Sequence, residues 1–439
     1  MIVVPSRRWL VGAALLALVA PLALVWPAAA GLLPALDLAW LAAFLLDAAR
    51  APAPRTLEIA REAPVAFAVG RAAVVRYRWR HRGRGALALE VRERLPDPLG
   101  GADAPTRTLA VPPGEGLDER VELTPVRRGP GSGGALAIRA LGPLGLAWRQ
   151  ETVTLPWSAT VYPSVPDAAL RALPLQLLRR REAGLRAIRR PGEGRLFEGL
   201  REWVPGDETR IIDWKATARR GKPIARQYED ERRQQVLIVI DAGRLLTAEV
   251  QGVPRLEAVI SAALQLARAA VEHDDNVGLM VFADTVQRYV APARGRRALR
   301  AVLDGLALAE GRLAESDYPA AFRHLAAHNR KRALTVLFTD VIDRTASEAL
   351  VAHAATLRPR HLPLAVTLRD PALEALAAAR PATTAGAFER AAAEELLGAR
   401  DAALAEMRGR GIMVLDVAPS GAGEAVVTRY HQLKRRGLL

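Results

Sequence analysis

The stretch QQVLIVIDAGRLL, residues 234–246, decides the fold of this chain. Its five consecutive apolar residues, 236–240, lead directly into Asp241, and such a run is typical of a strand that is buried on both faces of a sheet. A second stretch with this pattern, RALTVLFTD at residues 332–340, ends at Asp340. Ligands of open α/β sheets bind outside the carboxyl ends of the strands. The sequence therefore predicts that two carboxylates meet at the functional edge of one sheet, as a cation site or the remnant of one.

The segments around this stretch alternate between strand-like and helix-like patterns. Further apolar runs cover residues 277–282, 362–367 and 412–417, and residues 254–272 carry apolar side chains at helical spacing. Alternating strands and helices with right-handed crossovers give a doubly wound, mostly parallel sheet. We therefore expect an α/β domain in the C-terminal half of the chain.

The composition sets limits on the function. At 439 residues the chain is long enough for two or three domains. It has no cysteine, which excludes disulfides, thiolate catalysis and cysteine-ligated metals. The formal net charge of +15 suggests an acidic partner or an anionic membrane surface. Nearly all of the basic residues are arginine in an alanine-rich chain, which indicates a GC-rich genome, so we do not expect nucleic-acid binding.

Residues 1–50 predict a transmembrane helical hairpin. Residues 9–46 contain a single ionisable side chain, Asp37. Two apolar segments, 9–26 and 31–49, are each long enough to cross the hydrocarbon core of a bilayer as a helix. The chain is therefore expected to enter and leave a membrane before its first soluble domain.

A cleaved secretory signal is the alternative to the hairpin, because Arg7-Arg8, an apolar run and the alanines at 28–30 imitate its three regions. The second apolar segment favours the hairpin, since a mature chain would otherwise begin with another membrane helix. Arg7 and Arg8 precede the hairpin, and Arg50 and Arg55 follow it. The positive-inside rule then places both ends in the cytoplasm, which predicts a protein of the cytoplasmic (inner) membrane whose soluble domains face the cytoplasm.

Residues 51–166 predict an immunoglobulin-like β-sandwich. In residues 73–80, AVVRYRWR, apolar residues alternate with arginine as in a half-buried strand. Similar short runs are separated by Gly and Pro, and this spacing is typical of sandwiches. The cluster GPGSGG at 129–134 could form a phosphate loop, but no Gly-Lys-Ser/Thr follows it, which favours a turn. No catalytic constellation stands out in this domain.

Residues 167–195 predict a basic linker between the sandwich and the C-terminal part. A solvated helix is one interpretation of its arginines, and contact with anionic lipid headgroups is the other. Both remain open at this point.

A dense polar segment opens the C-terminal part, residues 196–439. The motifs REWVPGD at 201–207, RIIDWK at 210–215 and ARR at 218–220 resemble the signature of the bacterial domain-of-unknown-function family 58, DUF58. The resemblance extends to the order of hairpin, sandwich, signature and α/β domain. Proteins of this family often accompany MoxR-type AAA+ ATPases. The resemblance therefore implies such an ATPase as a protein partner, in protein maturation or envelope-related processes.

The order of strands and helices after the signature resembles that of a von Willebrand factor A domain. In that family a divalent cation is held by Asp-x-Ser-x-Ser after the first strand, a Thr in a later loop and an Asp after the fourth strand. The resemblance gives these positions to Asp241, Ser316 and Asp340, but Gly243 and Leu245 stand where the two serines would be. Because Mg²⁺ prefers a near-octahedral shell of oxygen ligands, we expect weak or no metal binding and no other cofactor.

Two close carboxylates without a cation need another source of compensation. We expect Asp241 and Asp340 to be screened by water, by backbone amides at helix N-termini, or by an arginine, and the candidate arginines are Arg244 and Arg344.

The function that these observations favour is that of a membrane-anchored, non-catalytic interaction or scaffold protein. No combination of nucleophile, base and orienting group stands out in the sequence. The signature is expected to bind the partner, and Trp214 to pack its ring against the α/β domain. The expected partner-binding residues are Arg201, Asp207, Arg210, Asp213, Trp214, Lys215 and Arg219. The alternative is a metal-dependent hydrolase that uses the carboxylates of Asp207, Asp213, Asp241 and Asp340.

Overall fold

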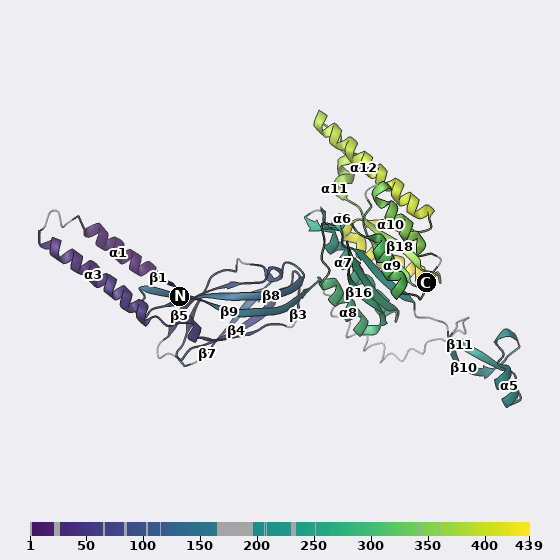
Figure 1. Ribbon diagram of the computed structural model, residues 1–439, viewed down its shortest axis with the longest axis horizontal. Coiled ribbons are helices and arrows are strands. Elements are labelled where there is room, and N and C mark those ends of the chain that lie inside the picture. Colours follow the sequence, from purple (N-terminus) through teal and green to yellow (C-terminus); the bar gives the residue numbers. More distant parts are fainter. Residues whose placement is uncertain are drawn as a thin grey trace. The chain divides into compact units, whose positions relative to one another are not determined.

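The chain divides into two compact units, Met1–Ser164 and Val165–Leu439, which we describe separately (Figure 1). The computed structural model describes residues 2–21, 27–64, 66–82, 86–101, 104–114, 116–164, 196–205, 207, 209–229, 234–250, 252–341, 344–358 and 360–439. The predicted basic linker, residues 167–195, lies outside the described residues.

Two apolar helices open the first unit. Helix α1 covers Arg7–Val19 and helix α3 covers Pro27–Arg50. They lie side by side, because the ring centroids of Trp9 and Phe44 are 5.2 Å apart and the Trp40 indole donates a hydrogen bond to the Trp9 carbonyl at 3.3 Å. The predicted pair of apolar helices is therefore present.

The two helices differ in length. Helix α3 has 24 residues, about 36 Å, and it contributes most of the one candidate membrane span among the described residues, Gly31–Thr56. Helix α1 has only 13 residues, about 20 Å, whereas the sequence predicted a helical segment over 9–26. It ends at Val19, two residues before Pro21, which has no N–H to continue the helical hydrogen bonds. Residues 22–26 lie outside the described part of the chain.

The rest of the first unit is made of two sheets. The larger sheet has the order β1-β9-β8-β5-β6, with β3 also paired to β9, and the smaller has the order β2-β4-β7. The strand bounds are β1 Ile2–Pro5, β2 Glu58–Glu62, β3 Ala66–Ala68, β4 Ala73–Arg80, β5 Leu87–Arg94, β6 Arg107–Val111, β7 Gly116–Leu123, β8 Gly129–Leu141 and β9 Ala147–Tyr162. Both sheets contribute to one apolar core, which contains Tyr77 and Trp79 of β4 and Leu89 and Ile138 of the larger sheet.

The sequence predicted a turn at the glycine cluster 129–134, and this prediction is wrong. The cluster forms the first half of β8. The pairing of β8 with β9 shifts between Gly133 and Ala135, and both Gly133 and Gly134 have positive φ. A side chain at 134 would also overlap the ring of Trp157. Glycine is therefore needed here for a bulge inside a strand.

A buried carboxylate joins the hairpin to the larger sheet. The side chain of Asp47, near the end of α3, is fully buried and accepts hydrogen bonds from the backbone N–H groups of Leu144, Leu146 and Ala147 at 2.6, 2.7 and 2.8 Å. Any side chain at Gly142 would overlap this carboxylate. Strand β1, which precedes α1, pairs with the start of β9 beside the same turn. Both ends of the hairpin are therefore fixed to one sheet.

The second unit contains a six-stranded sheet of order β16-β15-β12-β17-β18-β19. Its strands are β12 Gln235–Asp241, β15 Asn276–Phe282, β16 Val286–Arg294, β17 Leu334–Phe338, β18 Leu362–Leu368 and β19 Met413–Val417. Neighbouring strands are parallel except for β16, which runs antiparallel to β15 at one edge. The α/β prediction is confirmed, and the strand predicted from residues 236–240 lies between β15 and β17.

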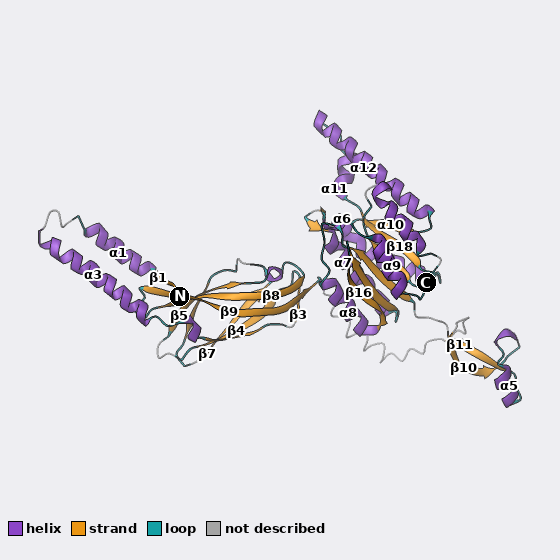
Figure 2. Ribbon diagram, viewed as in Figure 1, coloured by secondary structure: helices purple, strands orange, loops and turns teal. Residues whose placement is uncertain are grey.

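Helices cover both faces of this sheet (Figure 2). Helices α7 (Arg255–Glu272), α8 (Gly295–Ala307) and α13 (Ala422–Arg435) bury their apolar residues in the core on one face. Helices α9 (Tyr318–His328), α10 (Arg344–Thr356) and the second half of α12 (Thr384–Gly409) cover the other. The remaining short elements are α6 (Arg244–Thr247), β13 (Glu249–Val250), β14 (Val253–Pro254) and α11 (Pro371–Ala378).

The signature forms a small element of its own before β12. Strands β10 (Leu196–Glu202) and β11 (Ile224–Glu229) pair antiparallel, and helix α5 (Trp214–Arg220) lies in the connection between them. Short 3-10 turns complete the chain at Pro54–Thr56, Asp97–Leu99, Thr209–Ile211 and Pro419–Gly421.

Candidate functional site at the sheet edge and in the signature

Asp241 stands at the carboxyl end of β12 with a fully satisfied carboxylate. It is 2 % exposed. Its Oδ1 accepts hydrogen bonds from the backbone N–H of Gly243 at 3.0 Å and from the Ser316 hydroxyl. Its Oδ2 accepts from the hydroxyls of Tyr318 at 2.6 Å and Thr339 at 2.8 Å. A carboxylate has about four acceptor sites, so these four donors occupy its whole hydrogen-bonding capacity.

The Tyr318 and Thr339 hydroxyls reach Asp241 because helix α9 begins, and strand β17 ends, beside the end of β12. Tyr318 is the first residue of α9, and Thr339 directly follows β17, the strand that pairs with β12. Burial, followed by the nearby Asp241 charge and the hydrogen bond to it, raises the pKa of Tyr318 well above its usual value. Tyr318 is therefore a permanent donor to Asp241 at neutral pH.

Gly243 and Ser316 depend on each other. A Cβ atom at 243 would overlap the Ser316 hydroxyl and approach the carbonyl of Ala314 to 3.1 Å. Ser316 therefore occupies the space that a serine side chain at 243 would need. Of the residues predicted as a degenerate metal set, Asp241 and Ser316 are hydrogen-bonded to each other, and the third, Asp340, has different partners.

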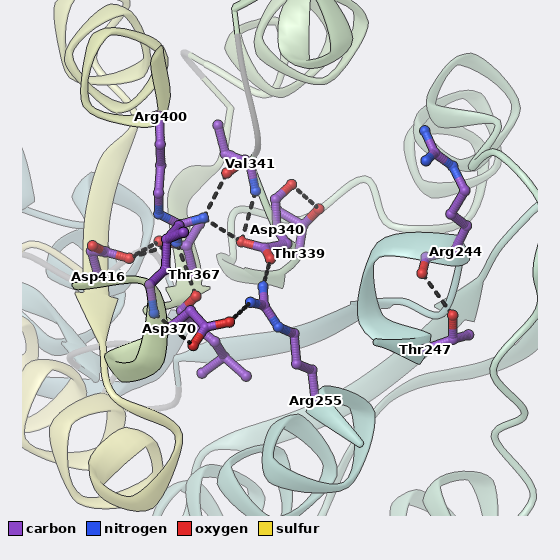
Figure 3. A network of polar contacts seen from close by, with 12 residues as sticks. Arg244, Thr247, Arg255, Thr339, Asp340, Val341, Thr367, Asp370, Arg400 and Asp416 are labelled. Carbon is purple, nitrogen blue, oxygen red and sulfur yellow. Dashed lines mark hydrogen bonds and ion pairs between the residues drawn. The ribbon is translucent and has the colours of Figure 1, made fainter. Parts of the chain in front are cut away.

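Asp340 is held by two arginines (Figure 3). It is 3 % exposed, and its Oδ1 accepts from the backbone N–H of Val341 at 2.9 Å and from Arg400 Nη1 at 2.6 Å. Its Oδ2 accepts from Arg255 Nη1. Hydrogen bonds between ionised groups of this kind are about twice as strong as neutral ones. Asp340 is therefore compensated by two fixed positive charges.

The same two arginines connect three strand ends. Arg255 Nη2 also donates to Asp370, after β18, at 3.2 Å. Arg400 Nη2 donates to Asp416 of β19 at 2.9 Å and to the carbonyl of Leu368 at 3.1 Å. Figure 3 shows that Arg255 and Arg400 approach Asp340 from different elements. We call Arg255, Asp340, Asp370, Arg400 and Asp416 the arginine network, and it lines a cavity of about 390 Å³.

Of the two arginines predicted to screen the carboxylates, the prediction is wrong for Arg244. Arg244 forms an ion pair with Glu315 at 2.5 Å on the exposed surface, and the side chain of Arg344 lies outside the described residues. Arg255 and Arg400 were missed because their sequence separation from Asp340 gives no local signal. One hint existed for Arg255, which is the first residue of α7, where the helix dipole disfavours a positive charge.

The side chains at the carboxyl edge of the six-stranded sheet are not arranged to coordinate a hard divalent cation. The hydroxyls of Ser316, Tyr318 and Thr339 direct their protons at Asp241, so their bonds compete with any metal for the carboxylate. Two guanidinium groups at Asp340 repel a cation from that side. Among the described residues, no group of three or more His, Cys, Asp or Glu side chains is placed to hold a metal ion. Asp241 and Asp340 do follow adjacent strands, as predicted, but each belongs to a separate set of contacts.

In the signature, Arg201 and Asp207 form a paired contact that closes a turn. Arg201 donates two hydrogen bonds to Asp207, at 2.5 and 2.7 Å, and the backbone N–H of Val204 donates a third at 3.0 Å. The Arg201 bonds, with a smaller contribution from Val204, lower the pKa of Asp207 to about 2. Both side chains therefore serve the local fold of the signature.

Asp213 has a similar structural role. It caps the N-terminus of α5 by accepting from the backbone N–H of Ala216 at 2.9 Å, and it also accepts from Arg226 at 2.9 Å. The Ala216 bond first, and then Arg226, lower the pKa of Asp213. Gly221 ends the helix in the left-handed conformation.

The remaining predicted signature residues face solvent. Trp214 is 70 % exposed, so the prediction that its ring packs against the α/β domain is wrong in this structure. Lys215, Arg219 and Arg210 are also exposed. Helix α5 and the turn before it therefore expose one aromatic ring and three basic side chains. We call these four residues, Arg210, Trp214, Lys215 and Arg219, the α5 face.

Comparison with known proteins gives a family for part of the chain. No curated protein matches the sequence. Among solved structures, the CARDB domain of a Pyrococcus furiosus protein in complex with di-metal ions is 15 % identical, with 24 % of this chain and 86 % of that chain covered and a TM-score of 0.17. The alkylpurine DNA glycosylase AlkC of Pseudomonas fluorescens is 11 % identical over 23 % of this chain and 30 % of that chain, with a TM-score of 0.15. Likenesses this weak support no functional argument. The family model described as "Protein of unknown function DUF58" matches residues 199–390, which confirms the resemblance over the signature and most of the α/β sheet.

Proposed function

We propose that this chain is a membrane-anchored, non-catalytic interaction protein that binds a MoxR-type AAA+ ATPase at the cytoplasmic face of the inner membrane. Its process is protein maturation or an envelope-related function. The signature makes the first contact in this proposal, and the carboxyl edge of the α/β sheet contributes a second surface.

The α5 face is the observation that carries the proposal. Trp214 is 70 % exposed, and Arg210, Lys215 and Arg219 of the same segment are exposed too, so an aromatic ring and basic groups are available to a partner together. Tryptophan and arginine are also the residues most enriched among those that dominate binding energy at interfaces. The acidic residues of the same segment, Asp207 and Asp213, are bonded within the signature, so they fix the shape that presents Trp214.

The architecture supports the finer fold assignments in this proposal. The strand order with an antiparallel β16 at the edge resembles that of a von Willebrand factor A-like domain. The common core of the two N-terminal sheets supports an immunoglobulin-like sandwich. Domains of the first type often bind proteins through the carboxyl edge, which here carries Asp241 and the arginine network.

The pairing of β1 with β9 supports the anchor. Residues 2–5 precede α1, yet they form part of the sheet that follows α3. The chain must therefore begin and continue on the same side of any membrane that the helices enter. Two crossings satisfy this condition and a single crossing does not. The arginines at both ends of the hairpin favour the cytoplasm as that side.

A metal-dependent hydrolase remains the weaker proposal. It would need free carboxylates, but Asp207, Asp213, Asp241 and Asp340 all accept several hydrogen bonds inside the protein. A general base works best with a pKa near the working pH, and the pKa of Asp207 is about 2.

Binding between the full chain in nanodiscs and a purified MoxR-type ATPase from the same organism tests the proposal. We expect Trp214→Ala to weaken binding about thirtyfold, because a central tryptophan typically contributes about 2 kcal/mol or more. The control is Phe388→Ala on α12, which removes an aromatic ring of similar exposure, 73 %. Equal loss of affinity in both variants, or no binding by the unchanged chain, would overturn the proposal.

A further inference from the structure

A cavity lies at the point where α3 meets the larger sheet of the first unit. Its volume is about 660 Å³, and its lining includes Arg50, the last residue of α3, and Arg82, just after β4. Leu87, Leu141 and Pro143 form part of its apolar wall. The lining of the cavity therefore combines two guanidinium groups with apolar side chains.

The position of this cavity matches the headgroup layer of a bilayer. The last apolar residue of α3 before Asp47 is Leu46, and Arg50 lies four residues further, about 6 Å along the helix axis. Arg50 and the cavity would then lie just outside the hydrocarbon core.

Charges at this end of the hairpin favour an anion. Arg7, Arg8 and Arg50 are exposed, whereas Asp47 is buried and saturated by backbone donors. Among the described residues, no carboxylate pairs with Arg50. The acidic residue in the cavity, Glu58, pairs with Arg82 at 2.6 Å, but both side chains are largely exposed, so water and salt screen the pair.

From this combination we propose that the cavity binds the headgroup of an anionic phospholipid, whose phosphate lies between Arg50 and Arg82. The acyl chains extend along the exposed apolar surface of α3 on the side of Arg50, which includes Leu46, one turn before it, and Leu36. Cationic pockets beside membrane helices recognise anionic headgroups in this way. The inference rests on the membrane anchor of the proposed function, but not on the ATPase partner.

Native mass spectrometry of the full chain in detergent micelles tests the site. Phosphatidylglycerol and phosphatidylcholine with identical acyl chains are the probes, and glycerol phosphate is the soluble competitor. We expect phosphatidylglycerol to bind about tenfold more tightly, since each nearby basic residue strengthens binding to an anionic lipid surface about fivefold and partial screening reduces the sum. The double variant Arg50→Gln/Arg82→Gln is expected to lose this preference, with little change in melting temperature because both side chains are exposed.

The matched control removes two exposed arginines elsewhere. In Arg94→Gln/Arg288→Gln, Arg94 lies at the other end of β5, about 23 Å along the strand from Leu87, and Arg288 lies in the second unit. This control should keep the full preference. The proposal is overturned if Arg50→Gln/Arg82→Gln still prefers phosphatidylglycerol, if both lipids bind equally to the unchanged chain, or if glycerol phosphate displaces the lipid at equal concentration. Carbonate extraction of membranes distinguishes a failure of the lipid site from a failure of the membrane anchor. Carbonate would release the chain from the membrane only if the helices do not anchor it.

Discussion

A buried carboxylate can be stabilised by hydroxyl groups in place of the cation that the sequence resemblance implied. At Asp241 three hydroxyls and one backbone N–H supply four hydrogen bonds. Such charge-assisted bonds each stabilise a folded protein by roughly 1.5–3 kcal/mol. The arrangement needs no ion, and it fixes the ends of β12 and β17 and the start of α9 relative to one another.

Replacement of Gly243 by Ser tests the close packing between Gly243 and Ser316. The new side chain would overlap the Ser316 hydroxyl, so we expect Gly243→Ser to lower the free energy of unfolding by about 1–3 kcal/mol, the usual cost of overpacking. Thermal unfolding of the full chain in micelles measures this change. The double variant Gly243→Ser/Ser316→Gly should recover most of the loss. Gly398→Ser, on open surface of α12, is the control and should be neutral. A Gly243→Ser protein as stable as the unchanged chain would contradict the close contact.

At the scale of single residues, the sequence predicted positions better than partners. Asp241 and Asp340 were recognisable because each follows an apolar strand. Arg255 and Arg400 were not, because they come from helices far along the chain and contact Asp340 only after the sheet has assembled. The exposure of Trp214 could not be predicted either. A tryptophan in a segment that mixes apolar and charged residues can lie in a core or on a surface.

At the scale of elements, the signature behaves as a small unit held by its own carboxylates. Asp207 and Asp213 both have lowered pKa values, and each is bonded to an arginine and to a backbone N–H. A carboxylate with a lowered pKa stabilises the folded form above its ordinary pKa, near 4. This stabilisation is lost as the pH falls through the folded value, about 2 for Asp207.

The signature should therefore open in acid between about pH 4 and pH 2. Hydrogen exchange of residues 199–207 in the full chain, compared at each pH with a free peptide of the same sequence, reports this opening. Arg201→Gln removes the main cause of the low pKa of Asp207 and should move the opening to higher pH. Arg219→Gln, on the exposed α5 face, should leave it unchanged. Equal protection of this segment at pH 6 and pH 2 would show that the Arg201–Asp207 contact does not hold the turn.

Elements also show where local patterns are ambiguous. The period-2 pattern of β4 and the apolar run of β12 identified strands correctly, because burial on one face or both leaves a distinct signature. The glycines of β8 indicated a turn, because glycine is favoured both in turns and at strand bulges with positive φ. Only the partner strand and the ring of Trp157 decide between them.

At the scale of the whole molecule, the pairing of β1 with β9 is the feature with the widest consequence. Four residues before α1 could not be assigned to a sheet from the sequence, because their partners lie about 145 residues later. Once paired, they tie the start of the chain to the soluble part. Together with the Asp47 hydrogen bonds, this pairing fixes both ends of the helical hairpin to the larger sheet. The orientation of the helices in a membrane therefore determines the orientation of that sheet.

The topology that follows can be measured directly, because the chain has no cysteine of its own. Ala20→Cys places a thiol in the connection directly after α1, and Thr152→Cys places one on the exposed side of β9. If both ends of the hairpin face the cytoplasm, a membrane-impermeant maleimide should label Ala20→Cys in intact spheroplasts and Thr152→Cys only after lysis. The reason is that β9 must lie on the same side as β1, while the connection between the helices lies on the other. Labelling of Thr152→Cys in intact spheroplasts would place the sheet outside and return the cleaved-signal interpretation, and equal protection of both sites would show that the helices do not cross the membrane.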